Sequence, residues 1–87
     1  MFEIEYLEQV KKHDIPALPK AVKSQVQKAI EKKLVTDPQL FGKPLRFNYL
    51  GLRRIRVGDY RVVYCIDSDK RLVTITAIGH RKDIYEE

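Results

Sequence analysis

Three β-rich runs follow one another in the second half of the chain. They cover residues 52–57, 60–67 and 71–80, and only the dipeptide Gly58-Asp59 and the loop 68–70 separate them. Turns this short between β-rich runs are typical of hairpins. The runs therefore predict an antiparallel meander.

The first half of the chain predicts one strand and two helices. Residues 1–6 alternate apolar and acidic side chains, the period-two pattern of a half-buried strand. Proline is poorly tolerated inside a helix but welcome in its first turn, so we expect one short helix to end before Pro16 and a second to begin at Pro19. The second ends at Asp37-Pro38, and its lysines, Lys33 among them, form its solvated face.

Residues 37–51 contain two prolines and two glycines and predict a loop-rich link, with a short strand around residues 45–47. The fold class expected from this pattern is α+β. It is a small single domain over residues 1–87, with an N-terminal strand, a two-helix hairpin packed on an antiparallel sheet, and a short charged C-terminal tail.

Composition excludes several classes of protein. The chain has 87 residues, 44% of them hydrophobic, which suits one small globular domain. Its single cysteine, Cys65, cannot form an intramolecular disulfide, and no apolar run is long enough to span a membrane, so we expect a cytoplasmic protein without a membrane partner. His13 and His80 lack metal-ligand spacing, so we expect no metal and no cofactor.

Positive charge is concentrated in one segment. The chain carries a net charge of +5, and residues 43–61 hold six basic residues against Asp59 alone, which is also 6 − 1 = +5. Such a patch favours a polyanionic partner, with nucleic acid ahead of an acidic protein. The basic residues are Lys43, Arg46, Arg53, Arg54, Arg56 and Arg61.

The hairpin register brings arginines together. A two-residue turn at Gly58-Asp59 places Arg56 opposite Arg61, and side-chain alternation puts Arg54 on the same face. Like charges directly opposite each other are destabilising, and a phosphate would relieve them. The alternative is a set of solvated arginines paired with acidic residues, namely Glu3, Glu5 or Asp59. We favour phosphate binding, because exposed ion pairs contribute little and need no clustering.

The third run ends in a second basic cluster. A three-residue loop at 68–70 would place Ala77, Gly79 and Arg81 on the face of Arg61. Gly79 would then allow close approach of a ligand, or mark a β-bulge. His80 is either a proton-transfer group, as histidine often is near neutral pH, or a surface residue at the strand end.

These segments together resemble the RelE/ParE toxin superfamily, over nearly the whole chain. The ending, with histidine and arginine followed by a tyrosine, is more similar to the RelE branch, ribosome-dependent mRNA endoribonucleases, than to the gyrase-directed ParE branch. The resemblance rests on three runs: Gly42-Lys43-Pro44-Leu45, Gly51-Leu52-Arg53-Arg54-Ile55-Arg56-Val57-Gly58-Asp59-Tyr60-Arg61-Val62-Val63-Tyr64 and Ile78-Gly79-His80-Arg81-Lys82-Asp83-Ile84-Tyr85.

The resemblance implies a toxin of a type II toxin–antitoxin system that cuts mRNA in the ribosomal A site by metal-free attack of a ribose 2′-OH. By similarity, Arg54 and Arg56 occupy two basic strand positions, Arg61 clamps phosphate, Arg81 lies on the leaving-group side, and Tyr85 is the base. The implied RNA-binding residues are Lys43, Arg46, Arg53, His80 and Lys82.

The implied partners are the ribosome, mRNA and a cognate RelB-like antitoxin with an acidic flexible segment. Operator DNA would be contacted only through the antitoxin.

The residues leave two matters open. Some family members carry lysines where this chain has Arg54 and Arg56, and arginine holds its proton, so these two residues stabilise charge rather than transfer protons. Tyr85 needs neighbouring cations to act as a phenolate, or it only packs the tail onto the sheet. The competing functions are a gyrase-directed toxin and a non-catalytic basic module that binds RNA or DNA.

Overall fold

The computed structural model describes residues 1–45 and 51–84, and a five-stranded sheet is its frame. The strands are β1 (Glu3–Tyr6), β2 (Lys43–Pro44), β3 (Arg53–Val57), β4 (Tyr60–Asp67) and β5 (Leu72–His80). They lie in the order β1-β5-β4-β3-β2. Strands β3, β4 and β5 form the predicted antiparallel meander, whereas β1 pairs with β5 in parallel, so the sheet is mixed.

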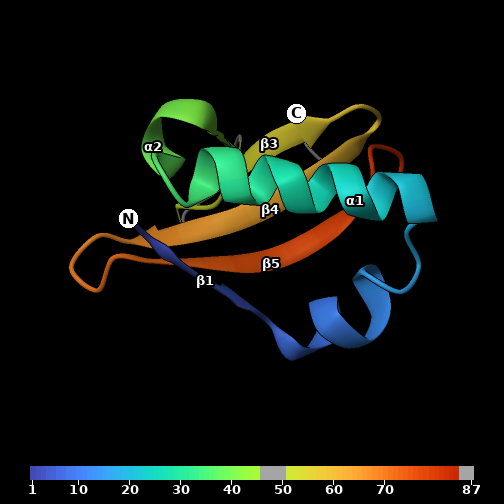
Figure 1. Cartoon of the computed structure of the whole chain (residues 1–87), viewed down its shortest axis with the longest axis horizontal. Coiled ribbons are helices and arrows are strands. Elements are labelled where there is room, and N and C mark those ends of the chain that lie inside the picture. The colour runs from blue at the N-terminus through green and yellow to red at the C-terminus, as the bar shows by residue number, and fades with distance from the viewer. Residues whose placement is uncertain (46–50, 85–87) are drawn as a thin grey trace.

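The helices cover one face of this sheet. Helix α1 (Lys20–Ala29) continues into the π-helical turn η2 (Ile30–Leu34), and Figure 1 shows the two as one continuous rod across the sheet. The first predicted helix is only a single π-helical turn, η1 (Val10–Asp14). None of the helices in the described ranges is long and apolar enough to cross a membrane.

The α1–η2 rod ends at Leu34, earlier than the predicted Asp37-Pro38, and Pro38 begins another helix. The predicted loop-rich link contains α2 (Pro38–Phe41), in which Asp37 caps the helix by accepting from the Leu40 N–H at 3.1 Å, and Pro38 occupies the first turn. The expected strand at 45–47 is replaced by β2, which ends at Pro44, and residues 46 and 47 lie outside the described residues.

The core lies between the sheet and the α1–η2 rod. Every second residue of β3 and β4 points toward the helices, as alternation requires, so Ile55, Val62 and Tyr64 pack with Val26 and Leu34. Tyr64 is fully buried, and its hydroxyl donates to the Pro38 carbonyl at 2.6 Å. This bond ties α2 to the central strand of the sheet.

The loop between β4 and β5 has four residues, not the three expected, because Asp67 pairs with Leu72. One more loop residue shifts the pairing of β5 with β4 by one position, which by itself would turn every β5 side chain to the opposite face of the sheet. However, the register shifts by one between Val63 and Tyr64, where Val63 pairs with Ala77 and Tyr64 with Ile75. This β-bulge returns Gly79 to the face of the sheet that carries Arg61, as the sequence predicts. In the observed register Gly79 lies directly opposite Arg61.

Candidate functional site

Four basic side chains share the face of the sheet that points away from the helices. Arg56 pairs with Arg61 across the β3–β4 hairpin, and Lys43 pairs with Arg54 across β2 and β3. Directly opposed residues lie on the same face, and alternation brings the two pairs together. We call this set, Lys43, Arg54, Arg56 and Arg61, the basic face.

Burial differs along the basic face. Arg56 is exposed and Arg54 is half-buried, whereas Arg61 is only 8% exposed. The Arg61 Nη1 donates to the Tyr60 carbonyl oxygen at 3.4 Å. A guanidinium held this far from water interacts more strongly with an incoming phosphate than one at the surface, because less water screens the charges. Arg61 is therefore suited to clamp an anion, and Arg56 to meet it.

The residues after β5 fold back over the same face. The Ile84 N–H donates to the His80 carbonyl at 3.0 Å, and Ile84 lies over Gly79. A Cβ at Gly79 would come within 3.3 Å of Ile84 side-chain atoms. The structure places the Ile84 side chain over Gly79, and the bulge lies earlier in β5 and not at Gly79, so the expectation of a bulge at Gly79 is wrong.

Arg81 lies beside the β3–β4 turn. Its backbone N–H donates to the Asp59 carbonyl at 2.8 Å, and its Nε is 3.9 Å from the Asp59 carboxylate. Both side chains are about two-thirds exposed, so this ion pair is weak and readily exchanged for a phosphate. Arg81 follows the end of β5 in a turn, together with the exposed Lys82.

His80 is held by its neighbours. Its ring packs edge-on against Tyr60 with centroids 5.3 Å apart, and its Nδ1 accepts from the Lys82 N–H at 3.1 Å. An accepting Nδ1 places the proton of a neutral ring on Nε2. The ring lines a cavity of ≈ 420 Å³ together with His13 and Asp14.

Arg53 does not join the basic face. It pairs with Tyr64 on the helix side of the sheet, and its Nη2 donates to the carbonyls of Gln39 and Gly42. Burial raises the pKa of the Tyr64 hydroxyl, and the neighbouring Arg53 guanidinium opposes that shift. Arg53 therefore fastens α2 to β3. Arg46 and Tyr85 lie outside the described residues.

A cavity of ≈ 260 Å³ at the β3 edge was not expected from the sequence. It lies where β3 runs beyond its short partner β2, and helical residues complete it. The sequence feature that indicates such a cavity is Phe41, an aromatic residue close to basic residues of neighbouring elements. The helical spacing of Lys33, however, predicts only a place on the solvated face of the helix. The lining residues are Lys33, Phe41, Lys43, Arg54, Ile55 and Arg56.

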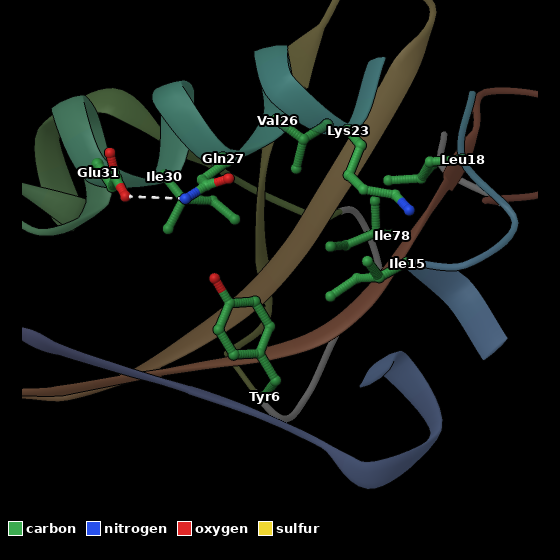
Figure 2. A pocket seen from close by; sticks show the side chains of 9 residues that line it. All are labelled: Tyr6, Ile15, Leu18, Lys23, Val26, Gln27, Ile30, Glu31 and Ile78. Carbon is green, nitrogen blue, oxygen red and sulfur yellow. Dashed lines mark hydrogen bonds between the residues drawn. The ribbon is translucent and has the colours of Figure 1, made fainter. Parts of the chain in front are cut away.

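A third cavity, of ≈ 220 Å³, lies on the helix side between α1 and the sheet. Figure 2 shows apolar side chains such as Ile30 and Ile78 along it, and the Tyr6 ring extending from β1 toward the helix. Gln27 donates to Glu31 at 3.3 Å at its rim. Burial, and secondarily the Glu31 carboxylate, raises the pKa of Tyr6. This cavity is separated from the basic face by the sheet.

Among residues 1–45 and 51–84, no group of three or more histidine, cysteine or acidic side chains is placed to hold a metal ion. The basic face can instead bind phosphate through fixed cations. Arginines neutralise the charge of a phosphate and that of a pentacoordinate intermediate formed from it.

Two comparisons by sequence point in one direction. A family model described as the ParE toxin of the type II toxin–antitoxin system parDE matches residues 4–85. Toxin RelE of Mycobacterium tuberculosis is 38% identical over 72 residues, which cover 83% of this chain and 74% of the relative. Toxin RelG of the same organism is 35% identical over 74 residues, or 85% of each chain.

Solved structures share the fold. The toxin–antitoxin complex RelBE2 from Mycobacterium tuberculosis contains a chain that matches with a TM-score of 0.81 and 29% identity, covering 94% of this chain and 93% of that one. The isolated Escherichia coli RelE toxin matches with a TM-score of 0.78 and 21% identity, over 92% of this chain and 84% of that one. The second match concerns the fold alone.

Proposed function

We propose that this chain, which belongs to the ParE toxin family of type II toxin–antitoxin systems, cuts mRNA on the ribosome. The resemblance to the RelE/ParE superfamily and the RelE-like α+β fold are confirmed, and the relatives named RelE and RelG place the chain on the RelE-like branch. The chain is thus a toxin of a type II toxin–antitoxin system, and what we propose is its target, the mRNA on the ribosome.

One observation carries the proposal: Arg56 lies directly opposite Arg61, on a face that also bears Arg54 and Lys43. Opposed like charges destabilise a sheet, and an anion bound between them would relieve that repulsion. A ribose phosphate of single-stranded RNA fits that requirement. The relatives named as RelE toxins support RNA as its source.

The chemistry needs no group beyond the chain, the RNA and water. The ribose 2′-oxygen attacks the adjacent phosphorus, its proton passes to a base, and the P–O5′ bond breaks. The products are a 2′,3′-cyclic phosphate and a 5′-hydroxyl, which requires a proton at the departing oxygen. Arg54, Arg56 and Arg61 neutralise the extra charge on the pentacoordinate phosphorus. Arg81 stabilises the negative charge on the departing 5′-oxygen, which takes its proton from water, and Tyr85 is the proposed base.

The antitoxin is the proposed regulator. In the RelBE2 complex, a chain of this fold is part of a toxin–antitoxin complex. A RelB-like partner with an acidic flexible segment would cover the basic face, because opposite charges attract. Operator DNA would then be reached only through the antitoxin. Ribosomes and mRNA place the activity in the cytoplasm.

The test is addition of the purified chain to a cell-free translation system, followed by primer extension on the mRNA with and without ribosomes. We expect ribosome-dependent cuts that Arg56→Ala and Tyr85→Phe each reduce by at least about a hundredfold. Lys70→Ala is the charge-matched control, since Lys70 lies in the β4–β5 loop and lines none of the three cavities.

Three outcomes contradict the proposal in different ways. Uncut mRNA with inhibited DNA supercoiling by gyrase would assign the chain to the gyrase-directed branch. RNA binding without cleavage would leave a non-catalytic basic module. Equal loss of cleavage in Lys70→Ala would mean that net charge, and not the basic face, determines activity.

A further inference from the structure

The cavity at the β3 edge combines features that the catalytic proposal does not use. It has a volume of ≈ 260 Å³, and none of its six lining residues is acidic. Arg54 and Arg56 reach it from the basic face, while Lys33 and Phe41 reach it from η2 and α2 on the helix side. The cavity therefore continues the basic face around the edge of the sheet.

Phe41 is exposed where a structural phenylalanine would be covered. Its side chain is 46% exposed, and the Lys33 ammonium lies 6.0 Å from its ring centroid. An aromatic ring next to cations is the arrangement on which unpaired nucleobases stack, because the ring receives the base and the cations receive the phosphate.

The cations around this ring are available. Among the described residues, Lys33, Lys43 and Arg56 make no ion pair with an acidic side chain. The site is open because β2 covers β3 only at Arg53 and Arg54, which leaves Ile55 as the cavity wall. A flat base can enter at this point without displacing any strand.

We propose that the β3-edge cavity binds one nucleotide of single-stranded RNA, with its base stacked on Phe41 and its phosphate among Lys33, Lys43 and Arg56. The inference rests on the proposed function for the identity of the ligand as RNA. It adds a binding position next to the basic face, so that one nucleotide is anchored at the sheet edge while its neighbour lies over Arg56 and Arg61.

The experiment uses the full chain without ribosomes. The probe is a short single-stranded RNA that is 2′-O-methylated, and so lacks the 2′-hydroxyl nucleophile, and that carries one 2-aminopurine. Stacking quenches 2-aminopurine fluorescence. We expect quenching with the unmodified protein, and its loss in Phe41→Ala together with an affinity decrease of at least about fivefold.

Leu40→Ala is the matched control. Leu40 is the neighbouring residue of α2, is 70% exposed, and does not line the cavity. It should retain both quenching and affinity. An RNA with an abasic site in place of 2-aminopurine keeps its phosphates, so its affinity for the unmodified protein should fall to that of Phe41→Ala for the intact probe.

The proposed site would be overturned by an absence of quenching with the unmodified protein, or by equal effects of Phe41→Ala and Leu40→Ala. It would also be overturned if an oligoglutamate peptide bound more tightly than the RNA and depended on Phe41, because the cavity would then belong to an acidic segment. Failure of the proposed function looks different, because quenching would then persist while mRNA in the translation assay stays uncut.

Discussion

Arg53 and Arg56 belong to the same strand but face opposite sides of the sheet. The Arg53 guanidinium donates to carbonyls of α2, while Arg56 is exposed opposite Arg61. Alternation along the strand already places Arg53 and Arg56 on opposite faces, but it does not show what the Arg53 side chain contacts. The difference depends on α2, whose position relative to β3 is a tertiary feature.

This contrast gives a paired prediction. Arg53→Ala should lower the free energy of unfolding by about 1–3 kcal/mol, because partly buried carbonyls lose a charged donor. Arg56→Ala should leave it unchanged or slightly higher, since a like-charge pair is removed. Urea denaturation of both variants measures this. A stable but non-toxic Arg53→Ala would return Arg53 to the RNA-contacting residues.

Buried tyrosines predict a loss of stability in alkali. Burial raises the pKa of the Tyr6 and Tyr64 hydroxyls above the ordinary tyrosine value of about 10, so the unfolded chain releases these protons at lower pH than the folded one. The contribution of these two hydroxyls to the free energy of unfolding should be constant below about pH 10. It should fall as the pH rises above about 10. Urea midpoints across this range measure the decline, and the double variant Tyr6→Phe with Tyr64→Phe should flatten it. An unchanged slope in that variant would refute the assignment.

At the scale of elements, Gly42 sets how closely α2 approaches the sheet. A Cβ there would lie 1.7 Å from the Tyr64 hydroxyl, which already donates to Pro38. Gly42→Ala should therefore cost about 1–3 kcal/mol of stability, measured by denaturation. Gly79→Ala is the control, because its methyl would come no closer than 3.3 Å to the side-chain atoms of Ile84 and Asp83 that lie nearest to it. Equal losses would mean that the contact with Tyr64 is not the cause.

Local sequence predicted the elements whose determinants are local. A two-residue turn sets the β3–β4 register, so the pairing of Arg56 with Arg61 was predictable. The β4–β5 loop was wrong by one residue, but the bulge opposite Val63 compensated for the error. Asp37-Pro38 was interpreted only as an end signal, although an aspartate followed by proline also begins helices. The cavity beside Phe41 brings together four elements, η2, α2, β2 and β3, so no single stretch of sequence predicts it.

At the scale of the whole molecule, the uneven charge predicts salt-dependent RNA binding. All of the net charge of +5 corresponds to residues 43–61, so each phosphate bound there releases counterions. The logarithm of the RNA affinity should fall linearly with the logarithm of salt concentration. Arg56→Ala should reduce that slope by about 0.7, whereas Leu40→Ala should not alter it. An unchanged slope in Arg56→Ala would place the phosphates elsewhere.

The parallel pairing of β1 with β5 has a consequence for synthesis. Residues of β1 leave the ribosome early, but their partner strand is translated long afterwards, and β5 also separates β1 from β4. Before β5 emerges, Gly79 is missing from beside Arg61 and the sheet lacks an inner strand. A nascent chain therefore cannot complete the sheet beside Arg61 until β5 has been synthesised.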